Sequence, residues 1–280
     1  MNSKIANTNL GPIEYTLEGE GEPVLIIHGG NGDCFINIRQ KQLIEEGYQV
    51  LIPSRPGYGK TPIDLGKTAA EQAIVMNTLL EFLNIQKVAV IATSAGGPTA
   101  LEFARQYADK TCCLLMEEAI SNTWVSKWSP IYWGMKYMMS PKRISKLWEN
   151  ERREFDTNQV KNLTALAKRF STLKPEEVLN QWDDEDLAFY REMLFSFSSG
   201  PGMIYTMDHK AKHIDQISVP VLIMHSPYDK NVPYRHAMYT HKKIKNSKLI
   251  KLPGLSHLIY MGIGKDVVIK NRLAFLKVYS

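Results

Sequence analysis

Short apolar runs alternate with helix-length amphipathic segments along most of this chain. The pattern predicts buried strands at 24–27, 48–52, 88–92, 112–116, 221–224 and 248–252. It predicts helices at 35–46, 69–83, 95–107, from Pro233 onward and at 265–278. Continuous apolar strands that alternate with helices are buried on both faces. The sequence therefore predicts an α/β fold with a mostly parallel central sheet and helices on both sides of it.

The alternation is interrupted between residues 120 and 207. This segment contains helical stretches rich in tryptophan, methionine and charged residues, and none of the short apolar strands. Its length is that of a small domain. We therefore predict a core made of residues 1–119 and 208–280, into which residues 120–207 are inserted as a helical cap.

Composition excludes other classes of protein. Hydrophobic residues make up 44% of the 280 residues, which is too high a fraction for a disordered chain. The 34 basic and 29 acidic residues give a net charge of +5, and this excess is too small to indicate a nucleic-acid partner.

The number and spacing of the cysteines, together with the hydropathy of the chain, indicate the cellular compartment. Cys34, Cys112 and Cys113 form neither a disulfide framework nor a CxxC pair, so we expect reduced thiols and no thiolate metal site. The first residues contain no apolar signal-peptide core, and no run of 18 apolar residues occurs. These features predict a cytoplasmic protein without a membrane span, and they leave the oligomeric state open.

The most informative segment is VAVIATSAGG, residues 88–97. A predicted strand ends there, Ser94 follows, and a predicted helix begins at once. A serine on so sharp a turn has a strained backbone and an exposed hydroxyl, and the turn needs small residues at Ala92 and Gly96. The N–H of Ala95 is free at the helix N-terminus and can face a developing negative charge. The alternative interpretation is a plain turn with an incidental serine.

A glycine-rich loop, HGGNG at 28–32, follows the first predicted strand. Closely spaced glycines let a backbone N–H point into a site, and the N–H of Gly30 can pair with that of Ala95 to bind an oxyanion. A glycine turn without function and a phosphate-binding loop are the alternatives. Neither a GxGxxG nor a GxxxxGK[ST] pattern occurs, which disfavours nucleotide binding.

Two later loops carry an acid and a base. Asp229 follows the predicted strand at 221–224, and His257 lies in the loop PGLSH, residues 253–257. Each is ordinary alone, but a serine nucleophile needs a base, and that base needs an orienting carboxylate. The chain order Ser94, Asp229, His257 is the one expected for a serine on a strand-to-helix turn.

Together these segments resemble the α/β-hydrolase superfamily of lidded esterases, epoxide hydrolases and peptidases. The resemblance rests on five ordered segments: HGG at 28–30, SRPGYGKT at 54–61, ATSAGG at 92–97, HSPYDKNVP at 225–233 and GLSH at 254–257. It implies that Ser94 is the nucleophile, His257 the general base and Asp229 its orienter. It also implies that Gly30 and Ala95 supply the oxyanion hole and that residues 120–207 roof the pocket.

The chain departs from the family pattern at Ala92, where many relatives have glycine, and at Ser54, where relatives often have aspartate. Neither departure affects the predicted catalytic residues. Some relatives place the acid after the next strand, the one that follows the helix beginning at the Ser94 turn, so Glu117 or Glu118 can replace Asp229. We prefer Asp229, because its loop matches better and the chain order holds.

These residues predict acyl transfer from a small molecule to water. His257 takes the proton of Ser94, which attacks a carbonyl carbon, and water then hydrolyses the acyl-enzyme. This chemistry needs no metal or organic cofactor. The serine nucleophile disfavours the dehalogenase and epoxide-hydrolase reactions that relatives perform with aspartate.

The cap tryptophans bear on the substrate. Trp124, Trp128 and Trp133 are candidates for an apolar pocket, although large apolar side chains are more often core residues. We predict a carboxylesterase that acts on small or medium, partly apolar esters.

Three other functions fit the sequence. A carbon–carbon bond hydrolase uses the same triad on diketone-like substrates. A ligand receptor can retain the triad and turn over far more slowly than the usual ~1 to 1,000 per second. An aminopeptidase acting on N-terminal proline needs a carboxylate cluster in the cap, and the candidates are Glu151, Glu154, Asp183, Asp184, Glu185 and Asp186.

Overall fold

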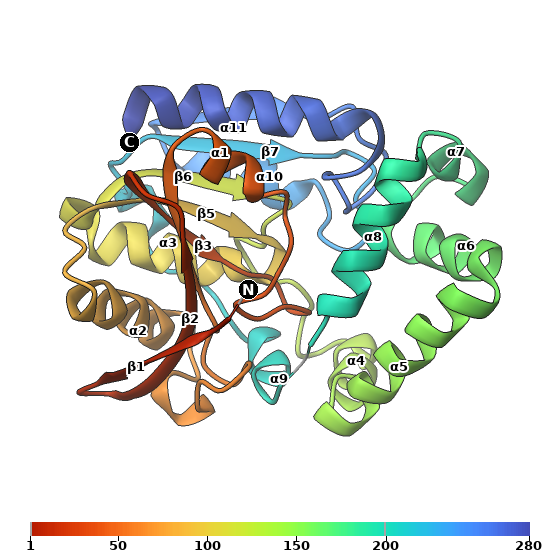
Figure 1. Ribbon diagram of the computed structural model, residues 1–280, viewed down its shortest axis with the longest axis horizontal. Helices are drawn as coiled ribbons and strands as arrows, with labels where there is room; N and C mark the ends of the chain where they lie inside the picture. Colours follow the sequence, from red (N-terminus) through yellow and green to blue (C-terminus); the bar gives the residue numbers. More distant parts are fainter. Residues whose placement is uncertain (1, 199) are drawn as a thin grey trace.

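The computed structural model describes residues 2–198 and 200–280. Residue 1, in the predicted core, and residue 199, in the predicted cap, lie outside the described residues. The strands are β1 (Lys4–Thr8), β2 (Gly11–Glu18), β3 (Glu22–Ile27), β4 (Tyr48–Pro53), β5 (Val88–Thr93), β6 (Thr111–Glu117), β7 (Val221–His225) and β8 (Ser247–Lys251). Within the described residues these eight strands form one sheet in the order β1-β2-β4-β3-β5-β6-β7-β8 (Figure 1).

The sheet is mostly parallel, as the sequence predicts. Strands β3 to β8 pair in parallel, whereas β1 with β2 and β2 with β4 are antiparallel. The carboxyl ends of β3, β5, β6, β7 and β8 therefore meet at one edge of the sheet. In parallel sheets this edge is where ligands usually bind.

The six predicted strands are confirmed, but the hairpin of β1 and β2 was not predicted from the apolar pattern. Strand β1 lies at the edge of the sheet and buries only Ala6. Strand β2 buries two polar residues, Glu14 and Thr16. Glu14 accepts a hydrogen bond from Ser54 Oγ, and Thr16 donates one to the Cys34 carbonyl. Neither strand therefore has the apolar run that marks the central ones.

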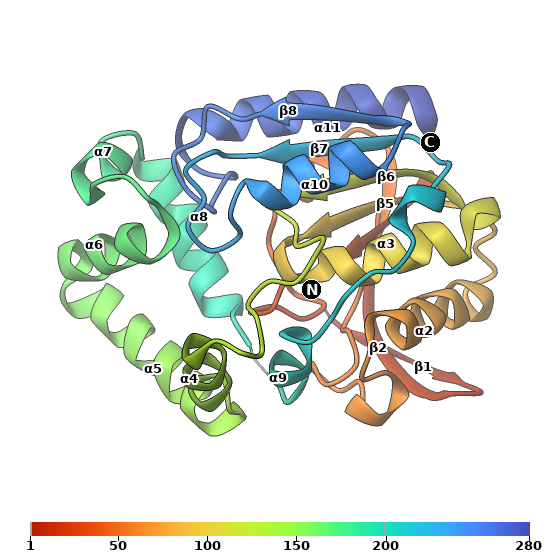
Figure 2. The same ribbon diagram turned by 180° about the vertical axis from the view of Figure 1, so that it is seen from behind.

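Alternate residues of the central strands pack on opposite faces of the sheet, which explains why these strands are apolar throughout. One face packs against α1 (Lys41–Glu45) and α11 (Lys265–Tyr279). The other packs against α2 (Ala69–Phe82), α3 (Gly97–Gln106) and α10 (Arg235–Lys243). Figure 2 shows these three helices on the viewer's side of the sheet.

The predicted helix at 35–46 is wrong over its first half, because only α1 is helical. In that half, polar side chains accept the backbone N–H groups that a helix would pair with its own carbonyls. Asp33 accepts the N–H of Phe35, and Asn37 accepts that of Arg39. Arg39 itself has a φ of 59°, which no α-helix contains.

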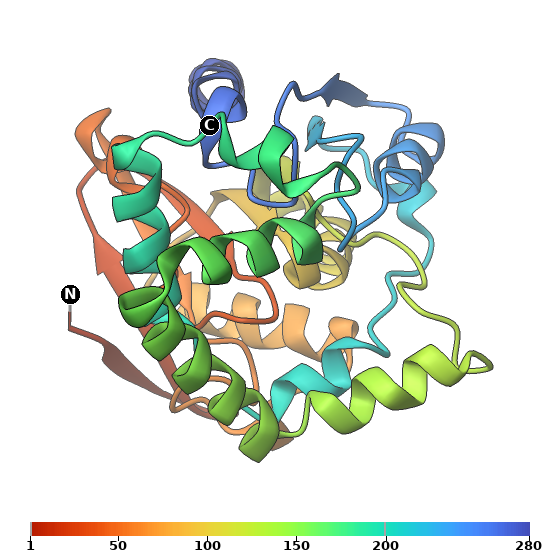
Figure 3. The same cartoon turned by 90° about the vertical axis from the view of Figure 1, so that its right-hand side faces the viewer.

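Between β6 and β7 the described residues form α-helices and no β-strand. The helices are α4 (Pro130–Met138), α5 (Pro141–Thr157), α6 (Gln159–Phe170), α7 (Pro175–Leu179), α8 (Asp184–Ser196) and α9 (Gly202–Thr206). Figures 1 and 3 show α4 to α8 beside the sheet edge where the parallel strands end. This arrangement fits the proposed cap.

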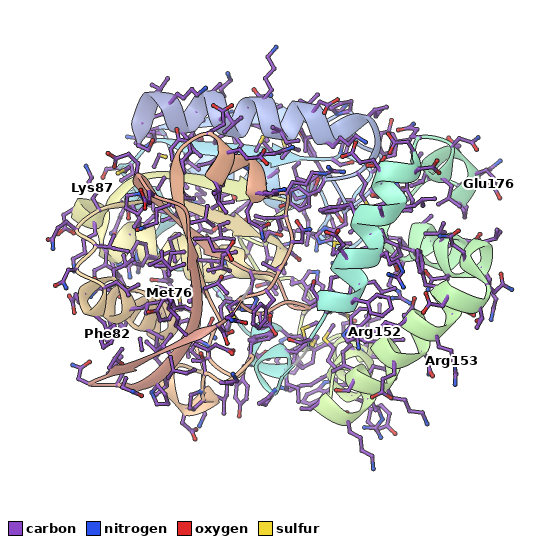
Figure 4. All side chains as sticks on the ribbon, in the orientation of Figure 1. Met76, Phe82, Lys87, Arg152, Arg153 and Glu176 are labelled. Atoms are coloured by element: carbon purple, nitrogen blue, oxygen red, sulfur yellow. The ribbon has the colours of Figure 1, made fainter. Side chains whose placement is uncertain are left out.

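Arg152 links two of these helices. Its side chain reaches from α5 to the end of α8, where it donates to the carbonyls of Leu194 and Phe197. Figure 4 shows Arg152 between the two helices and Arg153 on the outer side of α5. Within residues 2–198 and 200–280, no helix is both long and apolar enough to cross a bilayer.

Candidate active site

Ser94 lies at the carboxyl end of β5, on the predicted sharp turn. Its φ is 49°, in the left-handed region that non-glycine residues rarely adopt. A short 3-10 turn, Ser94–Gly96, leads directly into α3. Gly96 packs against strand β3 so closely that an added Cβ would lie 2.2 Å from the Ile27 carbonyl oxygen. The turn therefore depends on a residue without a side chain at this position.

Gly96→Ala is expected to lower the free energy of unfolding by about 2–3 kcal/mol, because backbone must move to admit the methyl group. Urea denaturation measures this loss. Gly134→Ala is the matched control, since an added Cβ there meets nothing within 4 Å and alanine favours the helix. Equal stability of the two variants would contradict the packing argument.

His257 connects Ser94 to a carboxylate. Its Nε2 lies 3.1 Å from Ser94 Oγ, and its Nδ1 lies 2.6 Å from Asp229 Oδ2. The ring stacks on Phe170 of α6, with the ring centroids 5.6 Å apart. The three predicted residues come from the loops after β5, β7 and β8, so the parallel sheet brings them to one edge.

Asp229 is buried and fully bonded. Its Oδ1 accepts the N–H groups of Asn231 and Val232, each at 2.8 Å. Burial opposes ionisation, but the His257 ring and the hydrogen bonds that Asp229 receives outweigh it, so the pKa of Asp229 lies well below its ordinary value. An ionised Asp229 holds His257 with its Nδ1 protonated and leaves Nε2 able to accept a proton.

The other two candidate acids have different hydrogen-bond partners. Glu117 binds Arg272 at 2.7 Å and the hydroxyl of Tyr260 at 2.8 Å. Glu118 accepts the N–H of Ser226 at 2.6 Å. The structure therefore brings Asp229, and neither glutamate, into hydrogen-bonding contact with His257 among the described residues.

Glu118 nevertheless lies next to the triad. Its carboxyl group, Asp229 and His257 offer oxygen and nitrogen atoms within 4.8 Å of one another, a spacing that can hold a cation. The closest of these atoms already hydrogen-bond each other, since His257 Nδ1 faces Asp229 Oδ2. Burial, and to a lesser degree the charge of Asp229, raises the pKa of Glu118 well above its ordinary value.

The two predicted oxyanion donors lie side by side. An added Cβ on Gly30 would lie 3.7 Å from the Cβ of Ala95 and only 2.7 Å from Met203 Sδ. Ala95 is the second residue of the turn that begins α3, where backbone N–H groups have no helical acceptor. The loop that holds Gly30 is braced by Arg55, which donates to the Gly29 carbonyl at 3.0 Å.

Two cavities flank Ser94. The smaller, about 70 Å³, is bounded by His257 and by apolar side chains that include Ile38 and Met193. The larger, about 150 Å³, reaches from Ser94 to Arg169 and Trp124. Asn31 and Asn231 border both, and the buried amide oxygen of Asn31 has no hydrogen-bond partner among the described residues.

A wider surface cleft of about 670 Å³ lies outside these cavities. Phe197 borders the cleft and the smaller cavity, whereas Trp148 borders the cleft and the larger one. The two rings pack against each other with their centroids 4.8 Å apart. This aromatic pair therefore separates the cleft from the cavities beside Ser94.

The predicted pocket tryptophans separate into two groups. Trp124 lines the larger cavity, but Trp128 is 96% exposed and Trp133 is 62% exposed, and neither borders a cavity beside Ser94. The prediction is wrong for these two, because α4 turns Tyr132 inward instead, where its hydroxyl donates to Asp208. Phe170 and Met193 were missed, since only packing of the cap onto the core brings them to Ser94. Asn231 was also missed, although it lies two residues after Asp229 in the same loop.

The cap carboxylates proposed to bind a free amine lie away from Ser94. Glu151 pairs with Arg169, and Asp186 pairs with Arg39 and Lys265. None of the six candidate carboxylates lines either cavity in the described part of the chain. The structure does not bring together the amine site that an aminopeptidase needs.

Known proteins match this fold and arrangement. A model of the alpha/beta hydrolase fold matches residues 22–262. An uncharacterized hydrolase of Bacillus subtilis, YcgS, is 33% identical over 259 residues, which cover 90% of each chain. A solved α/β-hydrolase fold protein from Nakamurella multipartita superposes with a TM-score of 0.81 at 23% identity, over 98% of each chain. The chain therefore belongs to the α/β-hydrolase family.

Membership makes the protein a hydrolase, and the family acts on small molecules. Part of the chain also resembles a 2-hydroxy-6-oxo-6-phenylhexa-2,4-dienoate hydrolase of Comamonas testosteroni. That similarity is 29% identity over 118 residues, or 39% of this chain and 41% of the relative.

Proposed function

We propose that this protein is a serine carboxylesterase that cleaves small or medium, partly apolar esters. The observation that supports it best is the hydrogen-bonded triad of Ser94, His257 and Asp229. Its serine lines two mostly apolar cavities. A serine hydroxyl becomes a useful nucleophile only when such a base and orienting acid are in place.

The proposed reaction has two halves. His257 Nε2 takes the proton of Ser94 as Oγ attacks the ester carbonyl, and the N–H groups of Gly30 and Ala95 stabilise the oxyanion. One such donor contributes roughly 3 kcal/mol in comparable sites. His257 then protonates the leaving alcohol, and a water activated by the same ring hydrolyses the acyl-enzyme.

The cavities favour short groups on either side of the ester bond. Volumes of about 70 and 150 Å³ fit a short acyl chain and a modest alcohol. We expect p-nitrophenyl acetate and butyrate to be hydrolysed at ~1 to 1,000 per second and prolyl-naphthylamide to be left intact. Turnover far below one per second on every ester would favour the receptor alternative, and rapid prolyl-naphthylamide cleavage would favour the aminopeptidase.

A second candidate is a carbon–carbon bond hydrolase for a dienoate. Two observations favour it: the resemblance to the Comamonas testosteroni hydrolase, and Arg169, which lines the larger cavity and also pairs with Glu151. An arginine there can bind the carboxylate of such a substrate.

Arg169 distinguishes the two candidates. If the substrate is a dienoate, we expect Arg169→Met to raise its KM by roughly tenfold or more, the loss of one charge-assisted hydrogen-bonded pair. KM for the uncharged p-nitrophenyl butyrate should change little. The matched control is Arg153→Met, since Arg153 lies on the outer side of α5 (Figure 4). Absence of dienoate cleavage by the unmodified protein would rule this candidate out.

A further inference from the structure

The polarity of α4 is the reverse of that of an ordinary surface helix. Its inward side carries Tyr132, which hydrogen-bonds Asp208, and Lys136, which ion-pairs with it; Asp208 lies in the loop after α9. Surface helices normally turn their charged residues toward solvent. Within this fully described helix the solvent side instead carries Ile131, Trp133, Gly134, Tyr137 and Met138, with no charged residue.

These side chains and that of Trp128, in the loop before α4, are exposed apolar groups close together in the chain. The indole of Trp133 donates to the Lys127 carbonyl at 3.1 Å, which ties this loop to the helix. Figure 3 shows α4, in yellow-green at the lower right, projecting beyond the other cap helices. Patches of this kind mark interaction sites in folded proteins. We call this group the α4 patch, and its members, each more than half exposed, are Trp128, Ile131, Trp133, Tyr137 and Met138.

Positive charge borders the α4 patch. Residues 119–148 contain five basic residues and no acidic one. Two of the five, Lys127 and Lys136, pair with Asp208. The other three are exposed on the first turns of α5, directly after α4: Lys142, Arg143 and Lys146.

One of these cations touches the patch itself. The Arg143 guanidinium lies 3.5 Å from the centre of the Tyr137 ring. Charge and aromatic surface therefore form one continuous face.

We propose that the α4 patch docks on an anionic lipid surface. Tryptophan and tyrosine prefer the boundary between lipid and water, because their rings are apolar and their N–H or O–H groups remain hydrated. Basic residues beside such a face are attracted to anionic headgroups. A projecting helix can enter this boundary, whereas it offers no groove to hold an extended peptide.

A second copy of the chain is a poorer occupant of the same surface. A two-fold contact would place the α4 patch of one copy against that of the other. The exposed cations Lys142, Arg143 and Lys146 would then face their own counterparts, and the absence of acidic residues from 119–148 leaves nothing in this segment to offset them.

Docking would also orient the candidate site. Trp124 precedes α4 and Met139 follows it, and both line the larger cavity beside Ser94. A lipid surface bound to the α4 patch would therefore lie next to that cavity. This proposal concerns binding alone and does not depend on the proposed esterase activity.

Co-sedimentation with unilamellar vesicles tests the proposal. The unmodified protein should bind vesicles of phosphatidylcholine mixed with phosphatidylglycerol and lose most of this binding in about 0.5 M salt, where the Debye length is short. Trp128→Ser combined with Trp133→Ser should weaken binding roughly tenfold or more, and so should Lys142→Glu combined with Arg143→Glu. Val160→Ser, at an exposed apolar residue of α6, is the matched control and should bind normally.

Trp128 also provides a spectroscopic signal. Its fluorescence should shift to the blue on vesicle binding, and the Trp128→Phe variant should lose that part of the shift. Circular dichroism shows whether each variant remains folded.

Three outcomes would overturn the proposal. They are failure of the folded protein to sediment with anionic vesicles, binding that the charge reversals leave unchanged, and a dimer in analytical ultracentrifugation that the tryptophan substitutions dissolve.

Discussion

Ser94→Ala is expected to lower ester turnover by about 10⁴-fold or more, since the variant retains cavities and oxyanion donors but has no nucleophile. A fluorophosphonate probe, followed by peptide mapping, measures the same loss directly. The label should lie on Ser94 in the unmodified protein and disappear in the variant. Folding should be unaffected, because the His257 ring is the one hydrogen-bond partner of Ser94 Oγ among the described residues.

Ser145 provides a matched control. It is an exposed serine on α5 that borders the outer cleft, and no base lies in hydrogen-bonding contact with it among the described residues. Ser145→Ala should keep full turnover and full labelling. Label found on another serine, or turnover that survives Ser94→Ala, would contradict the proposed nucleophile.

Asp229→Asn is expected to lower turnover by roughly 10³- to 10⁴-fold with little change in KM. Asparagine can still accept the N–H groups of Asn231 and Val232 through its carbonyl oxygen. Its amide nitrogen would then face His257 Nδ1 and favour the tautomer protonated on Nε2. That tautomer cannot take the proton of Ser94.

Glu118→Gln is the informative comparison, because Glu118 lies beside Asp229 in the same buried cluster. Glu118 Oε1 accepts the Ser226 N–H at 2.6 Å, and a glutamine side chain of the same shape can keep this contact through its amide oxygen. Turnover should therefore change by less than about threefold, the scale of a weak interaction. A large loss in Glu118→Gln with a small one in Asp229→Asn would reassign the acid.

Much of the fold follows from local pattern. The central strands could be predicted because they are apolar on both faces, and the sharp turn at Ser94 because it needs small neighbours. The edge strand β1 could not be predicted, because a short, mostly exposed strand has no apolar run. The irregular backbone of residues 35–40 could not be predicted either, because side chains that hydrogen-bond the backbone two residues away leave no periodic pattern.

The choice of acid needed the three-dimensional arrangement. Chain order favoured Asp229 over Glu117 and Glu118, but Glu117 ends strand β6 and the other two follow strands that end at the same edge of the sheet. Only the structure shows that Glu117 is taken up by Arg272 and Tyr260 while Asp229 faces His257. Such pairings join residues far apart in the chain, so no local pattern reports them.

Local periodicity was enough to predict the parallel sheet and a mainly helical segment between its strands, and the small residues, turn residues and chain order of three loops were enough to select Ser94, Asp229 and His257 as candidates. The directions of the cap side chains were decided by tertiary packing: Trp124, in the loop before α4, faces the larger cavity, whereas Trp128, in the same loop, and Trp133, on α4, face solvent. The physical reason is that apolar side chains make a helix amphipathic whichever surface they cover. Which surface that is depends on contacts with distant residues such as Asp208, to which the opposite side of α4 is bonded.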